Sequence, residues 1–160
     1  MAISVKGVSA LNRRLESISE RTDRELSLLL KKAAMEMKHR VEQQTHRDTG
    51  ALESAIRLKE TRSGINGRRA YEIYVDPEKR RRVKRKGSWS RQRVATYARR
   101  LETGEWGSKL GPGSRAKNNE ISGSGMRVGP GFFSRSASYV YDRYIGQMRR
   151  VVKRITRRRR

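Results

Sequence analysis

The sequence contains no cysteine and only three prolines in 160 residues. The absence of cysteine excludes disulfide bonds, thiolate catalysis and a zinc site of the CxxC type. Hydrophobic residues make up only 34% of the chain and aromatic residues 6%, so the core must be lean and part of the chain must gain order from partners. No stretch approaches the roughly 20 apolar residues of a membrane span, and the first residues, MAISVKGVSAL, lack the apolar run of a signal peptide. We expect a single domain, residues 1–160, that works in a cytoplasm-like compartment and not in a membrane.

Acidic residues are scarce in the second half of the chain. The formal net charge is +24. Residues 1–78 carry 15 basic and 12 acidic side chains, or +3, whereas residues 79–160 carry 25 and 4, or +21. The positive electrostatic field of the second half favours a polyanion or an acidic protein surface as partner. We interpret the basic segment 79–93 as a solvated loop and residues 157–160 as an arginine tail, with candidate contacts to DNA or another anionic partner at Lys79, Arg80, Arg81, Arg82, Lys84, Arg85, Lys86, Arg157, Arg158, Arg159 and Arg160.

Two stretches have the hydrophobic spacing of long amphipathic helices. From about Thr22 to Gln44, apolar residues recur every three or four positions, at Leu26, Leu29, Leu30, Ala33, Met37 and Val41. The same spacing recurs from about Phe132 to Thr156, at Phe133, Ala137, Val140, Tyr144, Met148, Val151 and Ile155. A stripe of this kind is normally buried against the rest of the domain. We expect both helices to pack on a sheet.

Between these helices the period of the apolar residues changes to two. Alternate residues are apolar on either side of the turn-forming segment 63–67, at Ile56, Leu58, Tyr71, Ile73 and Val75, which predicts an antiparallel hairpin. Helical spacing resumes at Val94 and stops near Gly104. Residues 104–131 are rich in glycine with little periodicity, which is typical of a long flexible loop, and 126–128 could add a short strand. The predicted fold class is α+β: a small antiparallel sheet packed by a long N-terminal helix and a C-terminal helix, with a long glycine-rich loop.

Three short strings lie where one predicted element gives way to the next. They are TGALESAI at 49–56, YARRLETG at 97–104 and GPGFFSRSA at 129–137. In this order and context they resemble the tailed-bacteriophage neck proteins called head-tail joining, head-tail connector or tail-completion proteins, which include the minor tail protein Z type. The residues that match the strings of that family are Thr49, Gly50, Leu52, Ser54, Tyr97, Ala98, Glu102, Pro130 and Phe132. The chain departs from the family pattern in the order Thr103–Gly104 and in having Gly131 where the family has a second proline.

The resemblance implies a structural virion protein that is assembled in the host cytoplasm. It implies a homo-oligomeric ring at the neck, which completes the tail or joins it to the portal-bearing head. Portal or adaptor proteins and tail proteins would then be the partners, with non-specific contact to genomic DNA also open. It implies a role in which no substrate is turned over.

The residues of the strings also have ordinary structural interpretations. Gly50 suits a tight turn, and Tyr97 and Phe132 suit the core. The Glu102 carboxylate sits near a helix end among many arginines. It could pair within the chain or across a subunit boundary, and the sequence leaves both alternatives open.

A free nucleic-acid-binding protein is the main alternative function. Trp89, Tyr97 and Trp106 lie near basic residues and could stack on bases while the basic residues contact phosphates. The chain has no zinc-finger spacing, no RNP-like aromatic strand, no KH-type GXXG loop and no bZIP heptads. Any nucleic-acid binding is therefore expected to be independent of sequence.

The sequence offers little support for a third class of function, an enzyme. His39 and His46 are seven residues apart, farther than the spacing of the HExxH zinc motif, and we interpret both as solvent-facing. None of the three strings combines a nucleophile, a base and an orienting group. We predict no catalytic, cofactor or metal residue.

Overall fold

The computed structural model describes residues 8–47, 50–62, 69–85, 87–105 and 110–157. Within these ranges the chain forms four α-helices and two separate two-stranded sheets. The elements are α1 (Val8–Gln44), η1 (Glu53–Ala55), β1 (Ile56–Arg62), β2 (Arg69–Val75), β3 (Arg80–Arg85), β4 (Ser88–Arg93), α2 (Val94–Thr103), α3 (Pro112–Ile121), η2 (Ser122–Ser124) and α4 (Phe132–Arg157). The predicted α+β class is confirmed.

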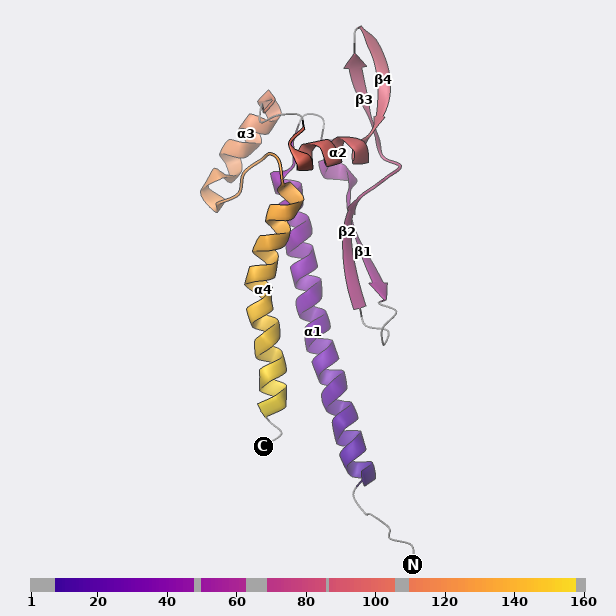
Figure 1. Cartoon of the computed structure of the whole chain (residues 1–160), viewed down its shortest axis with the longest axis vertical. Helices are drawn as coiled ribbons and strands as arrows, with labels where there is room; N and C mark the ends of the chain where they lie inside the picture. Colours follow the sequence, from indigo (N-terminus) through magenta and orange to yellow (C-terminus); the bar gives the residue numbers. More distant parts are fainter. Residues whose placement is uncertain (1–7, 48–49, 63–68, 86, 106–109, 158–160) are drawn as a thin grey trace, which may run out of the picture.

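The two long helices run antiparallel, side by side, and form the body of the molecule (Figure 1). Glu36 of α1 ties them together, because its carboxylate lies 2.6 Å from Nη1 of Arg143 and accepts the hydroxyl of Tyr144 at 2.8 Å. The guanidinium of Arg40 also stacks on the ring of Tyr139 at 3.4 Å. The α4 helix therefore covers α1, where sequence analysis expects it to cover the sheet.

The first sheet is the predicted hairpin. Its strands β1 and β2 pair antiparallel from Ile56 opposite Val75 to Arg62 opposite Arg69, and they lie along α1 (Figure 1). Alternation of apolar and charged residues explains this placement, since one face of the hairpin turns to the helix and the other to solvent.

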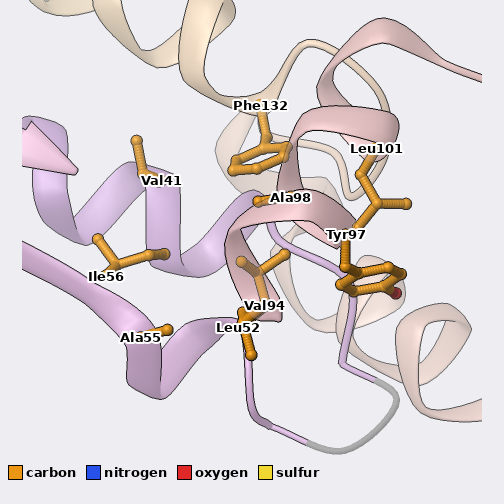
Figure 2. Packing of buried hydrophobic residues seen from close by; sticks show 9 residues of the cluster. All are labelled: Val41, Leu52, Ala55, Ile56, Val94, Tyr97, Ala98, Leu101 and Phe132. Carbon is orange, nitrogen blue, oxygen red and sulfur yellow. The ribbon is translucent and has the colours of Figure 1, made fainter. Parts of the chain in front are cut away.

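The core lies where the C-terminal end of α1 meets η1, α2 and the start of α4 (Figure 2). Nine buried residues converge there: Val41, Leu52, Ala55, Ile56, Val94, Tyr97, Ala98, Leu101 and Phe132. Each of the three short strings contributes residues to this core. The apolar residues of the strings therefore hold the elements of the fold together.

Three predicted segments differ from the structure. The N-terminal helix begins at Val8 and not near Thr22. The segment 79–93 is the hairpin β3–β4 and not a loop. The segment 104–131 contains α3 and η2, while 126–128 forms no strand. Within the described ranges, no helix is both long and apolar enough to cross a bilayer.

A candidate functional site: the string junction and the basic hairpin

The first string forms a turn that leads from α1 into β1. Gly50 has a φ of +65°, a conformation that glycine adopts at little cost. Its carbonyl accepts the backbone N–H of Ser54 at 3.0 Å, and the hydroxyl of Ser54 donates to the carbonyl of Ala51 at 3.1 Å. Leu52 is buried inside this turn, whereas Thr49 lies outside the described residues. The matching residues thus shape the turn and anchor it in the core.

Glu102 joins the second string to the third. Its carboxylate accepts the backbone N–H groups of Phe133 at 2.9 Å and Ser134 at 3.0 Å, together with the hydroxyl of Ser134. The first N–H groups of a helix have no partner within it, and a negative charge there interacts favourably with the helix dipole. The carboxylate therefore caps α4 within the chain, the first of the two alternatives left open above.

The backbones of these two strings also lie against each other. The N–H of Gly131 donates to the carbonyl of Glu102 at 3.1 Å. A Cβ atom on Gly104, at the left-handed end of α2, would stand 3.7 Å from the Cβ of Pro130. Phe132 follows as a fully buried core residue. The entry into α4 is thus fixed by the end of α2.

Arg135 and Gln44 hold the segment before α4 to the end of α1. The guanidinium of Arg135 donates to the side-chain oxygen of Gln44 at 3.1 Å, to the carbonyl of Arg127 at 2.9 Å and to that of Pro130. The amide of buried Gln44 in turn donates to the hydroxyl of Ser136 at 2.9 Å. Burial lowers the pKa of Arg135, and the nearby charge of Arg127 acts in the same direction. Nothing in the sequence pointed to this pair, because both residues are polar and neither is among those that match the strings of the family.

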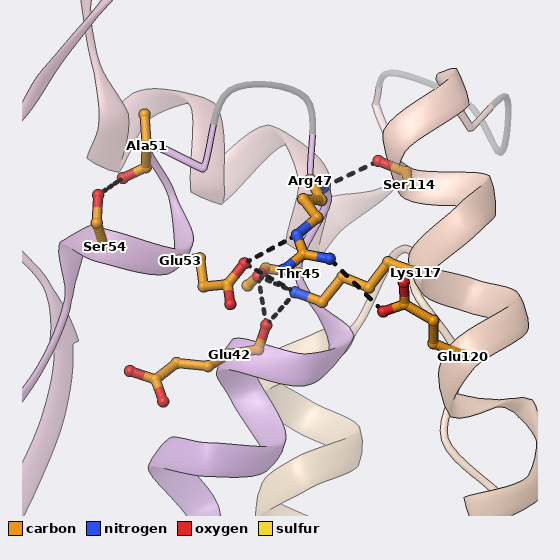
Figure 3. A network of polar contacts seen from close by, with 9 residues as sticks. All are labelled: Glu42, Thr45, Arg47, Ala51, Glu53, Ser54, Ser114, Lys117 and Glu120. Atoms are coloured by element: carbon orange, nitrogen blue, oxygen red, sulfur yellow. Dashed lines mark hydrogen bonds and ion pairs between the residues drawn. The ribbon is translucent and has the colours of Figure 1, made fainter.

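A buried lysine connects α3 to the end of α1 (Figure 3). Lys117 is only 2% exposed, and its Nζ donates to the carbonyl of Glu42 at 2.5 Å and to Oε2 of Glu53 at 3.2 Å. Burial lowers the pKa of Lys117, while the Glu53 carboxylate opposes that shift. The Arg47 guanidinium bridges Glu53 and Glu120, with N to O distances of 3.9 and 3.5 Å. No sequence signal pointed to Lys117, since lysine is rarely buried.

Gly113 allows α3 to approach the end of α1 closely. A Cβ atom at this position would stand 2.3 Å from the carbonyl oxygen of Arg47. We expect Gly113→Ala to destabilise the protein by about 1 to 2 kcal/mol, because α3 would have to shift. Gly123→Ala is the matched control, since a Cβ there meets no atom within 4 Å. Urea unfolding of both variants measures the difference, and equal stability of the two would contradict this packing.

The candidate anion contacts in the basic hairpin, β3–β4, differ in their exposure to solvent. Arg80 and Arg82 are exposed, as are Arg91 and Arg93 of β4, which the sequence analysis did not single out. Arg81 is instead buried, with its guanidinium stacked on Tyr97 at 3.4 Å and bonded to Gln92 at 3.1 and 3.3 Å.

The other members of that candidate set are less fully placed. Lys79 is half-buried, and its carbonyl accepts the N–H of Val94 at the base of the hairpin at 2.9 Å. Lys84 and Arg85 belong to β3, and Arg157 is the last residue of α4. Lys86 and residues 158–160 lie outside the described residues.

The two histidines do not share an environment. His39 is exposed as expected, but His46 is 6% exposed, so the expectation of a solvent-facing side chain is wrong there. His46 lies two residues after the end of α1, next to the buried residues Gln44 and Thr45. Across the described ranges, no three His, Cys, Asp or Glu side chains gather in a way that could hold a metal ion.

Comparison with known proteins places this arrangement in a family. The family model described as "Bacteriophage HK97-gp10, putative tail-component" matches residues 9–104, which is more than half of the chain. The chain belongs to the HK97 gp10-like family. The match runs from α1 to the end of α2 and includes the first two strings. It confirms the resemblance to phage neck and tail proteins and a structural role in the tail region of the virion. No curated protein and no solved structure matches this HK97 gp10-like chain.

Proposed function

We propose that this protein is a ring-forming subunit of the phage neck, which completes the tail or joins it to the portal-bearing head. It acts by binding and turns over no substrate. The family membership supports a tail-region role. The observation that carries the ring is a second apolar stripe on α4, beside the one that packs on α1.

The second stripe consists of four residues spaced by four, three and four positions: Tyr141, Ile145, Met148 and Val152. Such spacing places them on one side of a helix. Met148 lies at the boundary and also belongs to the first stripe. Tyr141 is 62% exposed and Val152 45% exposed, and Ile145 and Met148 between them are half-buried. A continuous stripe of this kind, unlike a lone apolar residue, is typical of a surface that another protein covers.

The long helix α1 carries a different exposed apolar surface. Leu28 and Met35 are seven residues apart and therefore share a face, and each is more than half exposed. Two unlike surfaces on one subunit are what a head-to-tail contact requires, and such contacts form a ring when the rotation closes. We assign the stripe of α4 and this face of α1 to contacts between neighbouring copies.

Assembly should depend on the α4 stripe and on salt. The paired variant Tyr141→Lys/Val152→Lys is expected to abolish the ring, because two charges would enter an apolar contact. Gly146→Lys is the control, since a side chain there points into open space on another side of α4. Sedimentation velocity should show wild type and G146K assembling as salt rises from about 10 to 150 mM, where screening shortens from about 30 to 8 Å. A ring that persists in the paired variant would contradict the assigned surface.

Joining is tested with particles rather than with the purified protein alone. Heads and tails made without this protein should stay separate, and addition of the wild-type protein should join them. Joined particles can be counted by electron microscopy. Binding to neither particle would refute a neck role, whatever the oligomeric state of the protein.

A further inference from the structure

The four arginines of the hairpin β3–β4 that are described as exposed lie on one face: Arg80, Arg82, Arg91 and Arg93. Residues that pair across an antiparallel ladder share a face, and successive residues of a strand alternate between faces. One face therefore contains Arg80 opposite Arg93 and Arg82 opposite Arg91, with Trp89 two residues before Arg91 on the same side of β4. The other face contains Arg81 opposite Gln92 and Val83 opposite Ser90. We call the first set the cationic face.

The opposite face attaches the hairpin to the body. Arg81 is 9% exposed because its guanidinium lies on the ring of Tyr97, a core residue of α2. The hairpin projects beyond α2 and away from the two long helices (Figure 1). The cationic face is thus held on a rigid support and turned away from the core.

The arginines of the cationic face have no acidic partner within the described part of the chain. Arg80, Arg82, Arg91 and Arg93 are all exposed, and none forms an ion pair there. Like charges that stand directly opposite each other destabilise a strand pair, and here two arginine pairs do so. No acidic residue occurs between Lys79 and Arg93 to offset them. An anionic partner would remove this repulsion.

The composition of this face favours nucleic acid over an acidic protein. The centre of a protein interface is usually depleted of charge, whereas interfaces with DNA are strongly positive. The cationic face has one large apolar side chain, Trp89, which is 63% exposed with the Arg82 guanidinium 5.7 Å from its ring centroid. A two-stranded ribbon also has a size that the major groove admits.

We propose that the cationic face binds duplex DNA through the phosphate backbone, without reading its sequence. The arginines donate paired N–H groups to phosphate oxygens, and neighbours on one strand stand about 6.6 Å apart along the duplex surface. Trp89 packs its ring against the sugar edge beside them. We identify this DNA as the genome that passes from head to tail, and this identification rests on the proposed function. The binding of duplex DNA by the cationic face does not depend on the proposed function.

The test removes one directly opposed pair of charges. Binding of the full chain to a fluorescein-labelled random duplex is followed by anisotropy between about 50 and 200 mM salt. Arg82→Gln/Arg91→Gln should lose roughly tenfold or more in affinity at the low-salt end and about 2 units of the log–log salt slope. The control is Arg99→Gln/Arg115→Gln, which removes the same charge from exposed positions on α2 and α3 and should bind within about twofold of wild type.

Each other outcome is informative. Equal binding by wild type and R82Q/R91Q would overturn the proposal, because the cationic face would then not carry the binding. An equal loss in the control pair would also overturn it, because net charge alone would explain binding. Loss of head or tail binding in R82Q/R91Q with unchanged DNA binding would assign the face to an acidic protein surface instead. The melting temperature of R82Q/R91Q should equal or exceed that of wild type, since repulsion is removed; a fall would count against the opposed pairs as a source of instability.

Ring formation separates this inference from the proposed function. R82Q/R91Q should assemble as wild type does, because the cationic face is remote from the apolar stripe of α4. Loss of DNA binding with the ring intact supports the inference. DNA binding through this face by a chain that forms no ring and joins no particles would refute the proposed function alone.

Discussion

Replacement of Lys117 by alanine is expected to destabilise the folded protein by about 2 to 5 kcal/mol. The side chain is almost completely buried, and its ammonium group satisfies the carbonyl of Glu42 and the carboxylate of Glu53. Alanine would leave a cavity and would remove the donor from both groups. Since Lys117 joins α3 to the end of α1, the loss should also release α3 from the body.

Lys117→Met is the matched variant that separates packing from hydrogen bonding. Methionine fills a similar volume but donates no hydrogen bond, so it should recover the packing part of the loss. Urea unfolding at neutral pH measures both variants. A Lys117→Ala protein as stable as wild type would show that the lysine is not buried in this way.

The buried lysine also predicts a dependence on pH. Burial lowers the pKa of Lys117 from the ordinary value of 10.5, so the charged form is disfavoured in the folded state. Below the lowered pKa, the free-energy cost of burying the charged form of Lys117 is fully present. As pH rises from there towards 10.5, the unfolded state binds more protons than the folded state, and stability gains from this group. The stability of wild type relative to Lys117→Met should therefore rise with pH in that window, and a fall would contradict the burial.

The parts of the fold that follow apolar periodicity were predictable. The helix from Phe132, the hairpin of β1 and β2, and the short helix from Val94 all have apolar residues at the spacing of their structure. The turn at Gly50 was predictable for a related reason, because residues that favour turns gather there. In each case local chemistry and tertiary packing point to the same structure.

The basic hairpin was missed because its strands have no apolar alternation. In β3 the charged residues fall on both faces, and the buried position is occupied by Arg81. A guanidinium stacked on Tyr97 fills the place where a strand pattern normally has an apolar residue. Gly87, with a φ of +81°, marks the turn and was the available signal.

The helix α3 was missed for the same kind of reason. Its buried residues are Ser114, Lys117 and Ile121, of which only the last is apolar. Pro112 at the first turn was a usable start signal, because proline suits that position. The early start of α1 had a signal too, since Leu11, Leu15 and Ile18 continue the helical spacing towards the N-terminus.

The role of Glu102 required the structure, because its partners lie 31 and 32 residues away. Sequence alone showed a carboxylate at a helix end and could not show which helix it served. We expect Glu102→Ala to destabilise the protein by about 2 to 3 kcal/mol, since the first turn of α4 loses a charged cap that accepts two backbone N–H groups. Urea unfolding gives the loss, and hydrogen exchange should show reduced protection of the first turn of α4.

Two further variants determine whether the cap is the cause. Glu105→Ala removes a nearby carboxylate that is exposed and only 3.9 Å from Arg100, and it should change stability by less than about 1 kcal/mol. Glu102→Gln keeps an oxygen acceptor but not the charge, so it should fall between wild type and Glu102→Ala. Because α4 carries the apolar stripe proposed for ring contacts, Glu102→Ala should also weaken assembly. If Glu102→Ala assembles and unfolds like Glu105→Ala, then the carboxylate does not fix α4, and the family string it belongs to serves another purpose.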